Sequence, residues 1–418
     1  MAEQHEKALV PQIRFTGFTD PWEQRKLGEL TESYSGGTPA AGESEFYGGS
    51  IPFIRSAEIA AESTELFLTE KGYESSSARM VKPGDVLYAL YGATSGEVAV
   101  SRQKGAINQA ILAILPRDDC DARYITAWLR KQKGYIVTTY LQGGQGNLSG
   151  VIVKNLEVFI PSLPEQQKIG FMLSHLDSLI TLHQRKYDKL CVLKKSMLDK
   201  MFPKGGSLYP EIRFAGFTDP WEQRKLGELY QKNDERNTDG LGSERTLSVA
   251  SMTFNSAGNG ADDSSLPNYK RLRLGDIAFE GHTNKEFAYG RFVLNDAGNG
   301  IMSPRFTCLR PIVEQEYSFW KYFIHSEKVM RPILVNSTKS GTMMNELVVE
   351  DFLKQEILVP SLPEQRQIGA FFDRLDSLIT LHQRKYDGCA NPLFLERRIS
   401  CRKPSHQNRC SATTTPSG

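Results

Sequence analysis

The residue types that most often carry out chemistry are scattered along this sequence without a catalytic spacing. Seven histidines and six cysteines are the candidates for metal ligands or nucleophiles. No two cysteines stand in a C-x-x-C spacing, so neither a zinc site nor a disulfide framework is indicated. His183 and His382 occupy equivalent places in a repeated segment, and we interpret them as polar contacts between helices. We therefore predict that no metal is bound.

Motifs for nucleotide binding and for phosphodiester or methyl-transfer chemistry are also missing. The sequence has no G-x-x-x-x-G-K-[ST] phosphate loop and no strand-linked G-x-G-x-x-G. It has neither the Asp/Glu-x-Lys ending of common nuclease sites nor the Asn/Asp-Pro-Pro-aromatic tetrad of amino-methyltransferases. Asn391-Pro392-Leu393-Phe394 comes closest to that tetrad, and we regard it as chance. We predict a non-catalytic chain with no catalytic residues.

The element with the clearest pattern is a long amphipathic helix over residues 162–202. Ser162 and Glu165 have the spacing of a capping box, and Pro164 lies in the first turn, where its missing N–H costs nothing. From Ile169 onward, mostly apolar residues recur at alternating steps of three and four, which is the heptad seam of a coiled coil. A helix of this length is suited to hold other parts of a protein apart.

The partner of this helix lies in the same chain, because the sequence is a tandem duplication. Ser361-Leu362-Pro363-Glu364 begins a second helix, in which Leu375–Asp387 repeats Leu176–Asp188 without a change. At the same offset, Gln12–Leu30 returns as Glu211–Leu229 with two replacements. A nearly identical frame therefore occurs twice.

The two inserts in this frame, residues 31–158 and 230–357, share only scattered matches but follow one plan. Each predicts short strands between glycine and proline turns, then a helix (122–141 or 318–335) and a polar loop. In the first insert a last strand is predicted from Val151 to Ile160. Two inserts with one plan and different residues are expected of two recognition modules with separate targets.

Composition places the chain among ordinary globular proteins. It has 418 residues, 39% hydrophobic and 10% aromatic residues and a net charge of +2. No apolar run approaches the length of a membrane span, and the first ten residues lack the apolar core of a signal peptide. We expect a cytoplasmic protein that has no contact with a membrane. Because the net charge is small, any DNA-binding face must be a local concentration of charge.

The frame blocks, the two P-S-L-P-E-Q helix starts and the waypoints G-G-T-P, P-G-D and G-N-L-S resemble the specificity subunit of type I restriction-modification enzymes. The resemblance covers residues 11–387. It implies an α/β (α+β) fold with two tandem target-recognition domains, separated by a pair of long antiparallel coiled-coil helices and related by a pseudo-two-fold axis. Such a spacer suits DNA, whose major groove faces the same side about every 34 Å.

The resemblance also implies a function and a set of partners. The subunit has no catalytic activity, and each recognition domain reads one half of a bipartite site in double-stranded DNA. The helices dock methyltransferase (modification) subunits, and restriction/translocase subunits join the complex afterwards. S-adenosylmethionine, ATP and Mg belong to those partner subunits, so no cofactor is expected on this chain.

The predicted division of the chain follows the frame. It comprises an N-terminal block (1–30), a first recognition domain (31–160), the central helix with the second block (161–229), a second recognition domain (230–359), a C-terminal helix (360–387) and a divergent tail (388–418) that we expect to be disordered.

Direct readout of DNA uses polar side chains presented to base edges, and such residues gather in the polar loops of both inserts. The candidates in the first insert are Thr38, Arg55, Ser56, Tyr91, Thr94, Ser95, Asn108, Gln109, Gln145 and Asn147, and those in the second are Ser251, Thr283, Lys285, Arg291, Ser303, Arg305, Lys339 and Thr342. The bland alternative for each residue is an ordinary solvated loop position. The helix-pair interface is predicted to include Ile169, Met172, Leu176, Leu179, His183, Leu190, Leu375, Leu378 and His382.

The repeat stops abruptly after Asp387, where Gly388-Cys389-Ala390 replaces the expected continuation Lys189-Leu190-Cys191. We interpret this as a frameshift or cassette junction that shortened the second helix. The alternative is a natural, divergent end. For the whole chain, the rival hypothesis from another class is a protein-interaction scaffold with two variable binding modules on a coiled coil.

Overall fold

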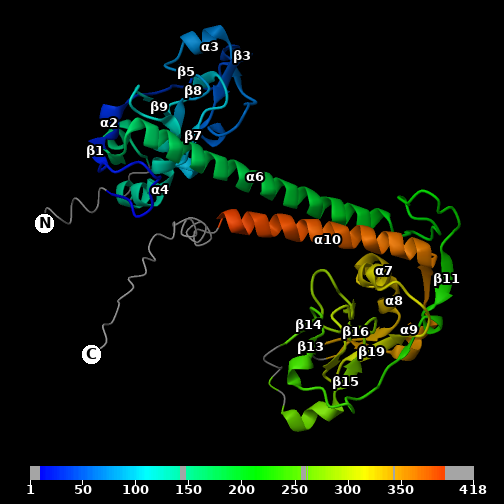
Figure 1. Cartoon of the computed structure of the whole chain (residues 1–418). Coiled ribbons are helices and arrows are strands. Elements are labelled where there is room, and N and C mark those ends of the chain that lie inside the picture. Colours follow the sequence, from blue (N-terminus) through cyan, green and yellow to red (C-terminus); the bar gives the residue numbers. More distant parts are fainter. Residues whose placement is uncertain (1–9, 142–146, 256–259, 261, 342–343, 391–418) are drawn as a thin grey trace, which may run out of the picture. The chain divides into compact units, whose positions relative to one another are not determined.

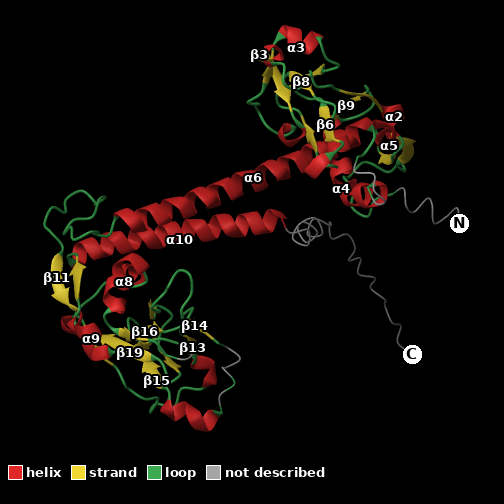
Figure 2. Ribbon diagram, turned by 180° about the vertical axis from the view of Figure 1, so that it is seen from behind, coloured by secondary structure: helices red, strands yellow, loops and turns green. Residues whose placement is uncertain are grey.

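The computed structural model describes residues 10–141, 147–255, 260, 262–341 and 344–390 (Figure 1). The chain divides after Leu179, inside helix α6 (Leu163–Lys200), into unit 1 (Met1–Leu179) and unit 2 (Ile180–Gly418). Each unit mixes strands and helices, as Figure 2 shows by colour, and the order of elements in unit 1 recurs in unit 2. The predicted α/β fold with two tandem domains is confirmed.

Unit 1 is built on two small sheets. One sheet has the order β2-β9-β6-β7 and the other β4-β3-β8-β5, while β1 pairs with β10. The strands are β1 (Glu23–Lys26), β2 (Thr31–Ser35), β3 (Tyr47–Ile54), β4 (Phe67–Leu68), β5 (Arg79–Val81), β6 (Val86–Ala89), β7 (Val98–Val100), β8 (Gly105–Ile107), β9 (Ile111–Pro116) and β10 (Glu157–Ile160). The helices before α6 are α2 (Leu27–Leu30), α3 (Glu70–Glu74), α4 (Ala122–Tyr140) and α5 (Gly150–Lys154), with short 3-10 turns η1 (Ser44–Phe46), η2 (Ser56–Glu58) and η3 (Gly92–Thr94).

Strand β6 lies at the centre of unit 1, and all four of its residues are buried. Successive side chains of a strand point to opposite faces, so a continuous apolar run is buried on both sides. Val86 and Tyr88 pack with the α4 residue Leu129 in one cluster. Leu87 and Ala89 pack in a second cluster on the other face. The predicted core strand is thus the layer between helix α4 and the second sheet.

Unit 2 repeats this arrangement with other residues. The central sheet is β12-β19-β16-β17, and β11 pairs with β22 as β1 does with β10. The strands are β11 (Glu222–Lys225), β12 (Tyr230–Lys232), β13 (Leu247–Ser248), β14 (Thr253–Phe254), β15 (Lys270–Leu272), β16 (Ile277–Glu280), β17 (Arg291–Leu294), β18 (Gly300–Met302), β19 (Thr307–Pro311), β20 (Thr338–Lys339), β21 (Glu346–Leu347) and β22 (Glu356–Val359). The helices are η4 (Leu226–Glu228), η5 (Ser243–Arg245), η6 (Asp263–Asn268), α7 (Tyr317–Phe323), α8 (Glu327–Val335), α9 (Val349–Lys354) and α10 (Leu362–Ala390).

Three of the predicted elements are wrong in detail. The strand expected from Val151 to Ile160 begins as helix α5, because the Ser149 hydroxyl accepts a hydrogen bond from Ile152 N and caps a helical turn; only β10 is extended. The helix expected over 318–335 is two helices, α7 and α8, separated by Ile324–Ser326. Helix α10 also continues past the predicted end at residue 387, to Ala390. Residues 391–418, where the remainder of the tail lies, are outside the described part.

The repeated frame is held together by the same buried ion pair in both units. Arg14 donates two hydrogen bonds of 2.7 Å to the Glu165 carboxylate, and Arg213 does the same to Glu364. Both carboxylates are at most 1% exposed. The predicted capping-box role of Glu165 is therefore wrong, since its carboxylate binds the N-terminal block instead. In each unit, the glutamate of the repeated P-E-Q motif thus binds the arginine of the repeated block in the same unit.

The glutamine of the P-E-Q motif makes a second set of contacts, equivalent in the two units. Gln166 Oε1 accepts a hydrogen bond from Asp121 N and its Nε2 donates to Pro161 O, and Gln365 makes the same bonds to Glu316 N and Pro360 O. Both side chains are buried. The first turn of each long helix is thus fixed to the helix that begins at residue 122 in unit 1 and at residue 317 in unit 2.

Residues 180–200 of α6 and helix α10 run antiparallel within unit 2, side by side in both views (Figures 1 and 2). His183 faces His382 with 3.1 Å between the two Nδ1 atoms, and Lys194 pairs with Asp376 at 2.6 Å. Further along, Phe202 contacts Phe372 with a ring-centroid distance of 6.2 Å. These pairs step in opposite directions along the two helices, as the predicted antiparallel coiled coil requires.

Candidate nucleic-acid interface

In unit 1 the polar loops meet at one edge of the fold because two strands end there in parallel. Strands β3 and β8 pair parallel with Ile54 opposite Ile107, so the residues that follow them, Arg55 and Asn108, leave at the same end. The glycine loop is pressed onto this edge: Gly37 N donates to Ile107 O at 3.2 Å. A Cβ atom on Gly36 would lie 1.8 Å from the same oxygen, so only glycine fits there.

This edge places several predicted residues in direct contact. The Thr38 hydroxyl donates to the Gln109 side-chain oxygen, and the Tyr91 hydroxyl donates to the Gln109 carbonyl oxygen. Tyr91 also forms an isolated bridge with Asn147. Thr94 and Ser95 follow on the adjoining η3 turn, where the Ser95 hydroxyl donates to Gly92 O at 2.9 Å. We name Thr38, Tyr91, Asn108, Gln109 and Asn147 the unit 1 corner; Gln145 lies outside the described residues.

Arg55 and Ser56 reach the same edge but are differently placed. The Arg55 guanidinium binds the Glu58 carboxylate at 2.5 Å, within the η2 turn. This hydrogen bond lowers the pKa of the Glu58 carboxyl from its usual range. Arg55 is therefore already neutralised by a neighbour, and it must exchange that partner before it can bind a phosphate or a base.

Unit 2 presents the corresponding edge. A parallel bridge joins Thr246 to Ile301, so Ser251 after β13 and Ser303 after β18 emerge together. The Ser251 hydroxyl hydrogen-bonds with the Thr253 hydroxyl at 2.7 Å. Arg291 donates to Ala250 O at 3.2 Å, which joins strand β17 to the same loop.

A second group of loops completes the unit 2 edge. Asn345 N donates to Gly281 O at 2.9 Å, as Leu148 N does to Leu90 O in unit 1. Thr283 and Lys285 lie on the exposed loop after Gly281, and Lys339 lies on the hairpin β20-β21 that ends beside it. Arg305 is exposed and follows Ser303 on the loop after β18. We name Ser251, Thr283, Lys285, Arg305 and Lys339 the unit 2 corner; Thr342 lies outside the described residues.

The two corners differ in charge. The unit 1 corner consists of neutral hydrogen-bonding groups. In unit 2, Lys285, Arg305 and Lys339 are exposed, and none forms an ion pair with a described residue. The guanidinium of Arg305 lies 4.7 Å from the centre of the Phe306 ring, and that of Arg291 lies 5.1 Å from the centre of the Phe287 ring. Unit 2 thus offers cations suited to phosphate, and unit 1 offers donors and acceptors suited to base edges.

Sequence reasoning missed one residue of the unit 2 edge. His282 follows β16 where Tyr91 follows β6, and its Nδ1 lies 2.5 Å from a Glu280 carboxylate oxygen. Aligning the buried strand Ile277–Glu280 with Val86–Ala89 would have identified it.

No metal centre is found at these corners in the described part of the chain. No group of three or more His, Cys, Asp and Glu side chains that could hold a metal ion occurs there. Burial raises the pKa of the Cys120 and Cys308 thiols to about 12, so neither ionises near neutral pH. No helix among the same residues is both long enough and apolar enough to cross a membrane.

The predicted helix-pair residues fall into two groups. In unit 2, His183 contacts His382, Leu375 is 6% exposed, and Leu190 packs against the core cluster that includes Leu375. Leu378 was predicted to lie in the interface, but it is 37% exposed, and the neighbouring Ile379 is half-buried. The seam steps by four from Leu375 to Ile379 and then by three to His382, so the predicted order of the steps was reversed.

In unit 1, helix α6 uses its first turns for a different contact. Ile169 packs against the core cluster of unit 1, and Leu176 and Leu179 are half-buried. Met172 is 36% exposed while Leu173 is half-buried, the same one-residue correction as at Leu378.

The histidine pair predicts a pH dependence of stability. Burial, then the neighbouring His183, Lys186 and Lys385, lower the pKa of His382 below its usual 6.5. Below about pH 6.5 the unfolded chain therefore binds more protons than the folded one, so stability is fully present at pH 7.5 and falls as the pH drops through 6.5 toward the folded pKa. We expect the denaturant midpoint of unit 2 to fall less between pH 7.5 and 5.5 in His382→Asn than in the unchanged protein. If the denaturant midpoint falls by the same amount in His382→Asn as in the unchanged protein, the assignment to His382 is contradicted.

Comparison with known proteins gives a consistent result. The profile of the type I restriction modification DNA specificity domain matches residues 19–191 and again residues 218–388. The type I restriction enzyme MjaIX specificity subunit of Methanocaldococcus jannaschii is 24% identical over 390 residues, which covers 87% of this chain and 89% of that protein. The EcoR124I/EcoR124II specificity subunit of Escherichia coli is 26% identical over 187 residues, covering 40% of this chain and 46% of that one.

A solved structure shares the fold. The crystal structure of a type I restriction-modification system S subunit from M. genitalium superposes with a TM-score of 0.57 at 13% sequence identity, covering 95% of this chain and 100% of that one. At this level of identity the match concerns the fold alone.

Proposed function

Because the chain belongs to the type I restriction-modification DNA specificity family, with two tandem specificity domains, we propose that it selects the DNA site of such a complex. Each unit reads one half of a bipartite site in double-stranded DNA. The observation that carries the proposal is that one frame, with the same Arg-Glu ion pair and the same loop edge, occurs twice and presents different polar residues each time.

The contacts at the corners suggest how the reading is divided. Gln109 and Asn147 are exposed amides, which can pair with two atoms of one base, and Gln109 is oriented by Thr38 and Tyr91. Lys285, Arg305 and Lys339 are exposed cations without a carboxylate partner among the described residues, and they suit phosphate oxygens. Unit 1 would thus discriminate mainly by hydrogen bonds, and unit 2 would add a larger salt-dependent component.

We propose further that the chain itself is non-catalytic and acts in the cytoplasm within an assembly. Methyltransferase subunits dock on the helix pair and use S-adenosylmethionine, and restriction/translocase subunits that use ATP and Mg join them. The helix pair has exposed apolar side chains that suit a protein partner, among them Leu182, Val192 and Leu381.

Mapping methylated adenines tests the proposal. A host genome is sequenced with and without this chain in the presence of its methyltransferase. We expect methylation that depends on this chain, at one motif made of two short defined halves with undefined bases between them. Removal of the chain should abolish methylation at that motif. Methylation at a single continuous motif, or a pattern independent of this chain, would contradict the proposal.

A further inference from the structure

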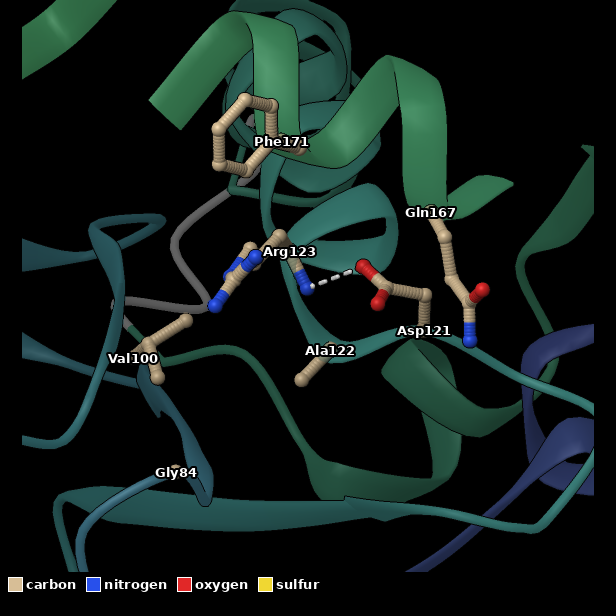
Figure 3. A pocket seen from close by; sticks show the side chains of 7 residues that line it. All are labelled: Gly84, Val100, Asp121, Ala122, Arg123, Gln167 and Phe171. Carbon is tan, nitrogen blue, oxygen red and sulfur yellow. Dashed lines mark hydrogen bonds between the residues drawn. The ribbon is translucent and has the colours of Figure 1, made fainter. Parts of the chain in front are cut away.

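Unit 1 has a cavity whose lining residues differ from those at the equivalent place in unit 2. It measures about 510 Å³ and lies between the start of helix α4, the first turns of α6 and the turn before β6 (Figure 3). Figure 3 shows Phe171 and Gln167 above it on α6, Arg123 and Asp121 beside it, and Gly84 below. None of these residues belongs to the unit 1 corner.

The repeat identifies the equivalent place in unit 2 residue by residue. Gly84 N donates to Ser101 O at 3.0 Å, and Gly275 N donates to Asn295 O at 2.9 Å. On the other wall, Asp121 N and Glu316 N both donate to the frame glutamine. These matched bonds identify Ala122 in unit 1 as the equivalent of Tyr317 in unit 2.

Tyr317 fills in unit 2 the space that is open in unit 1. A Cβ atom on Gly275 would lie 2.2 Å from Tyr317 Cε1, so the phenol ring rests directly on that glycine. A Cβ atom on Gly84 would meet nothing within 4 Å. Because alanine stands at 122, no described ring covers Gly84 as Tyr317 covers Gly275.

The walls of the cavity indicate what would accompany the ring. Phe171 is 61% exposed and stacks on His175 at a centroid distance of 6.0 Å, which leaves its other face for a second aromatic group. Arg123 is exposed, and its guanidinium forms no ion pair with a described residue. The equivalents of Phe171 and Arg123 in unit 2 are Ala370 and Ser318, which offer neither a ring nor a charge. The equivalent of Gln167 is Arg366, whose guanidinium already pairs with Glu314 and Glu316. An aromatic side chain next to a carboxylate matches these walls.

We propose that this cavity binds one aromatic side chain, with an acidic neighbour that pairs with Arg123, from the methyltransferase subunit of the complex. The inference rests on the function proposed above and adds the anchor through which one docking contact is made. Ring and charge come together in a concave, partly apolar site, the setting in which single residues dominate binding. The two units then dock their partners differently, since Tyr317 already occupies the second site.

Filling the cavity tests the inference. Ala122→Tyr copies into unit 1 the residue that unit 2 has, so the fold should accept it. Titration of the full-length chain with purified methyltransferase subunit should show a Kd about 30-fold higher than for the unchanged chain, as for loss of one aromatic anchor. Phe171→Ala removes an exposed wall without a change in the core and should also weaken binding.

A matched control separates the cavity from a general effect of an added ring. Gly134 lies on the exposed side of α4, where a Cβ meets nothing within 4 Å, so Gly134→Tyr adds the same ring outside the cavity. It should bind as the unchanged chain does. If the unchanged chain binds the methyltransferase and Ala122→Tyr and Phe171→Ala bind equally well, the cavity inference is overturned and the proposed function stands. If the unchanged chain does not bind it, the proposed docking function fails, and the inference fails with it.

Discussion

Replacing Glu364 by alanine is expected to lower the free energy of unfolding of unit 2 by about 3 kcal/mol. The carboxylate is 1% exposed and accepts two hydrogen bonds of 2.7 Å from Arg213, whose side chain is 15% exposed. Its removal leaves a largely buried guanidinium with one remaining bond, to Asp219 O at 2.6 Å. Because the pair fixes the first turn of α10 to the block that carries Trp221, the loss should affect the whole unit.

The measurement is chemical denaturation followed by tryptophan fluorescence. Trp221 and Trp320 are buried in the core of unit 2, so a background in which Trp22 and Trp128 are replaced by phenylalanine reports on unit 2 alone. Glu314→Ala is the control, because Glu314 is 74% exposed and pairs with Arg366 at 3.3 Å; its loss should cost less than about 0.5 kcal/mol. Equal small effects for both variants would show that the frame pair is not structural.

The repeated frame was predictable from the sequence because its physics is local and occurs twice. The long helix expected over residues 162–202 is α6, and the second helix start at Ser361 leads directly into α10. What a single sequence did not reveal is the role of Glu165. A glutamate three residues after a serine fits a capping box, and only the fold brings Arg14 to it across 151 residues.

The inserts were less predictable, since their elements are short and tertiary contacts decide between helix and strand. Val151, Ile152 and Val153 favour a strand by composition, yet the Ser149 cap and the burial of Val153 produce a helical turn. The seam of the helix pair shows a similar limit. Steps of three and four fit two registers one residue apart, and in unit 2 Ile379 is half-buried whereas Leu378 is 37% exposed.

The candidate corners depend on topology that sequence alone does not give. That Thr38, Tyr91 and Gln109 would touch could not be derived from their positions in three separate loops. Backbone hydrogen bonds from Gly37 N to Ile107 O and from Leu90 N to Ala110 O bring the three loops together at the end of β8. Polar loop composition did identify the residues, but it could not show that Arg55 is already paired with Glu58.

The largest effects on DNA binding should come from changing half of the site. Each wrong base pair typically costs about 1–3 kcal/mol, and such costs are roughly additive between separate positions. Scrambling either half of the methylated motif should therefore weaken binding of the assembled complex by about 1000-fold or more, toward the non-specific level. The contribution of unit 2 should also fall more steeply with salt, because its corner carries the cations.

The most direct test of the central claim combines these duplexes with variants of each corner. The intact motif, and the motif with either half scrambled, compete for complexes that contain Gln109→Ala with Thr38→Ala, or Ser251→Ala with Thr283→Ala, since hydroxyl groups, unlike the phosphate-binding cations, can read base edges. We predict that the unit 1 variant loses discrimination at one half only and the unit 2 variant at the other half only. If both variants lose discrimination at the same half, or neither does at any half, the two units do not read separate parts of the site.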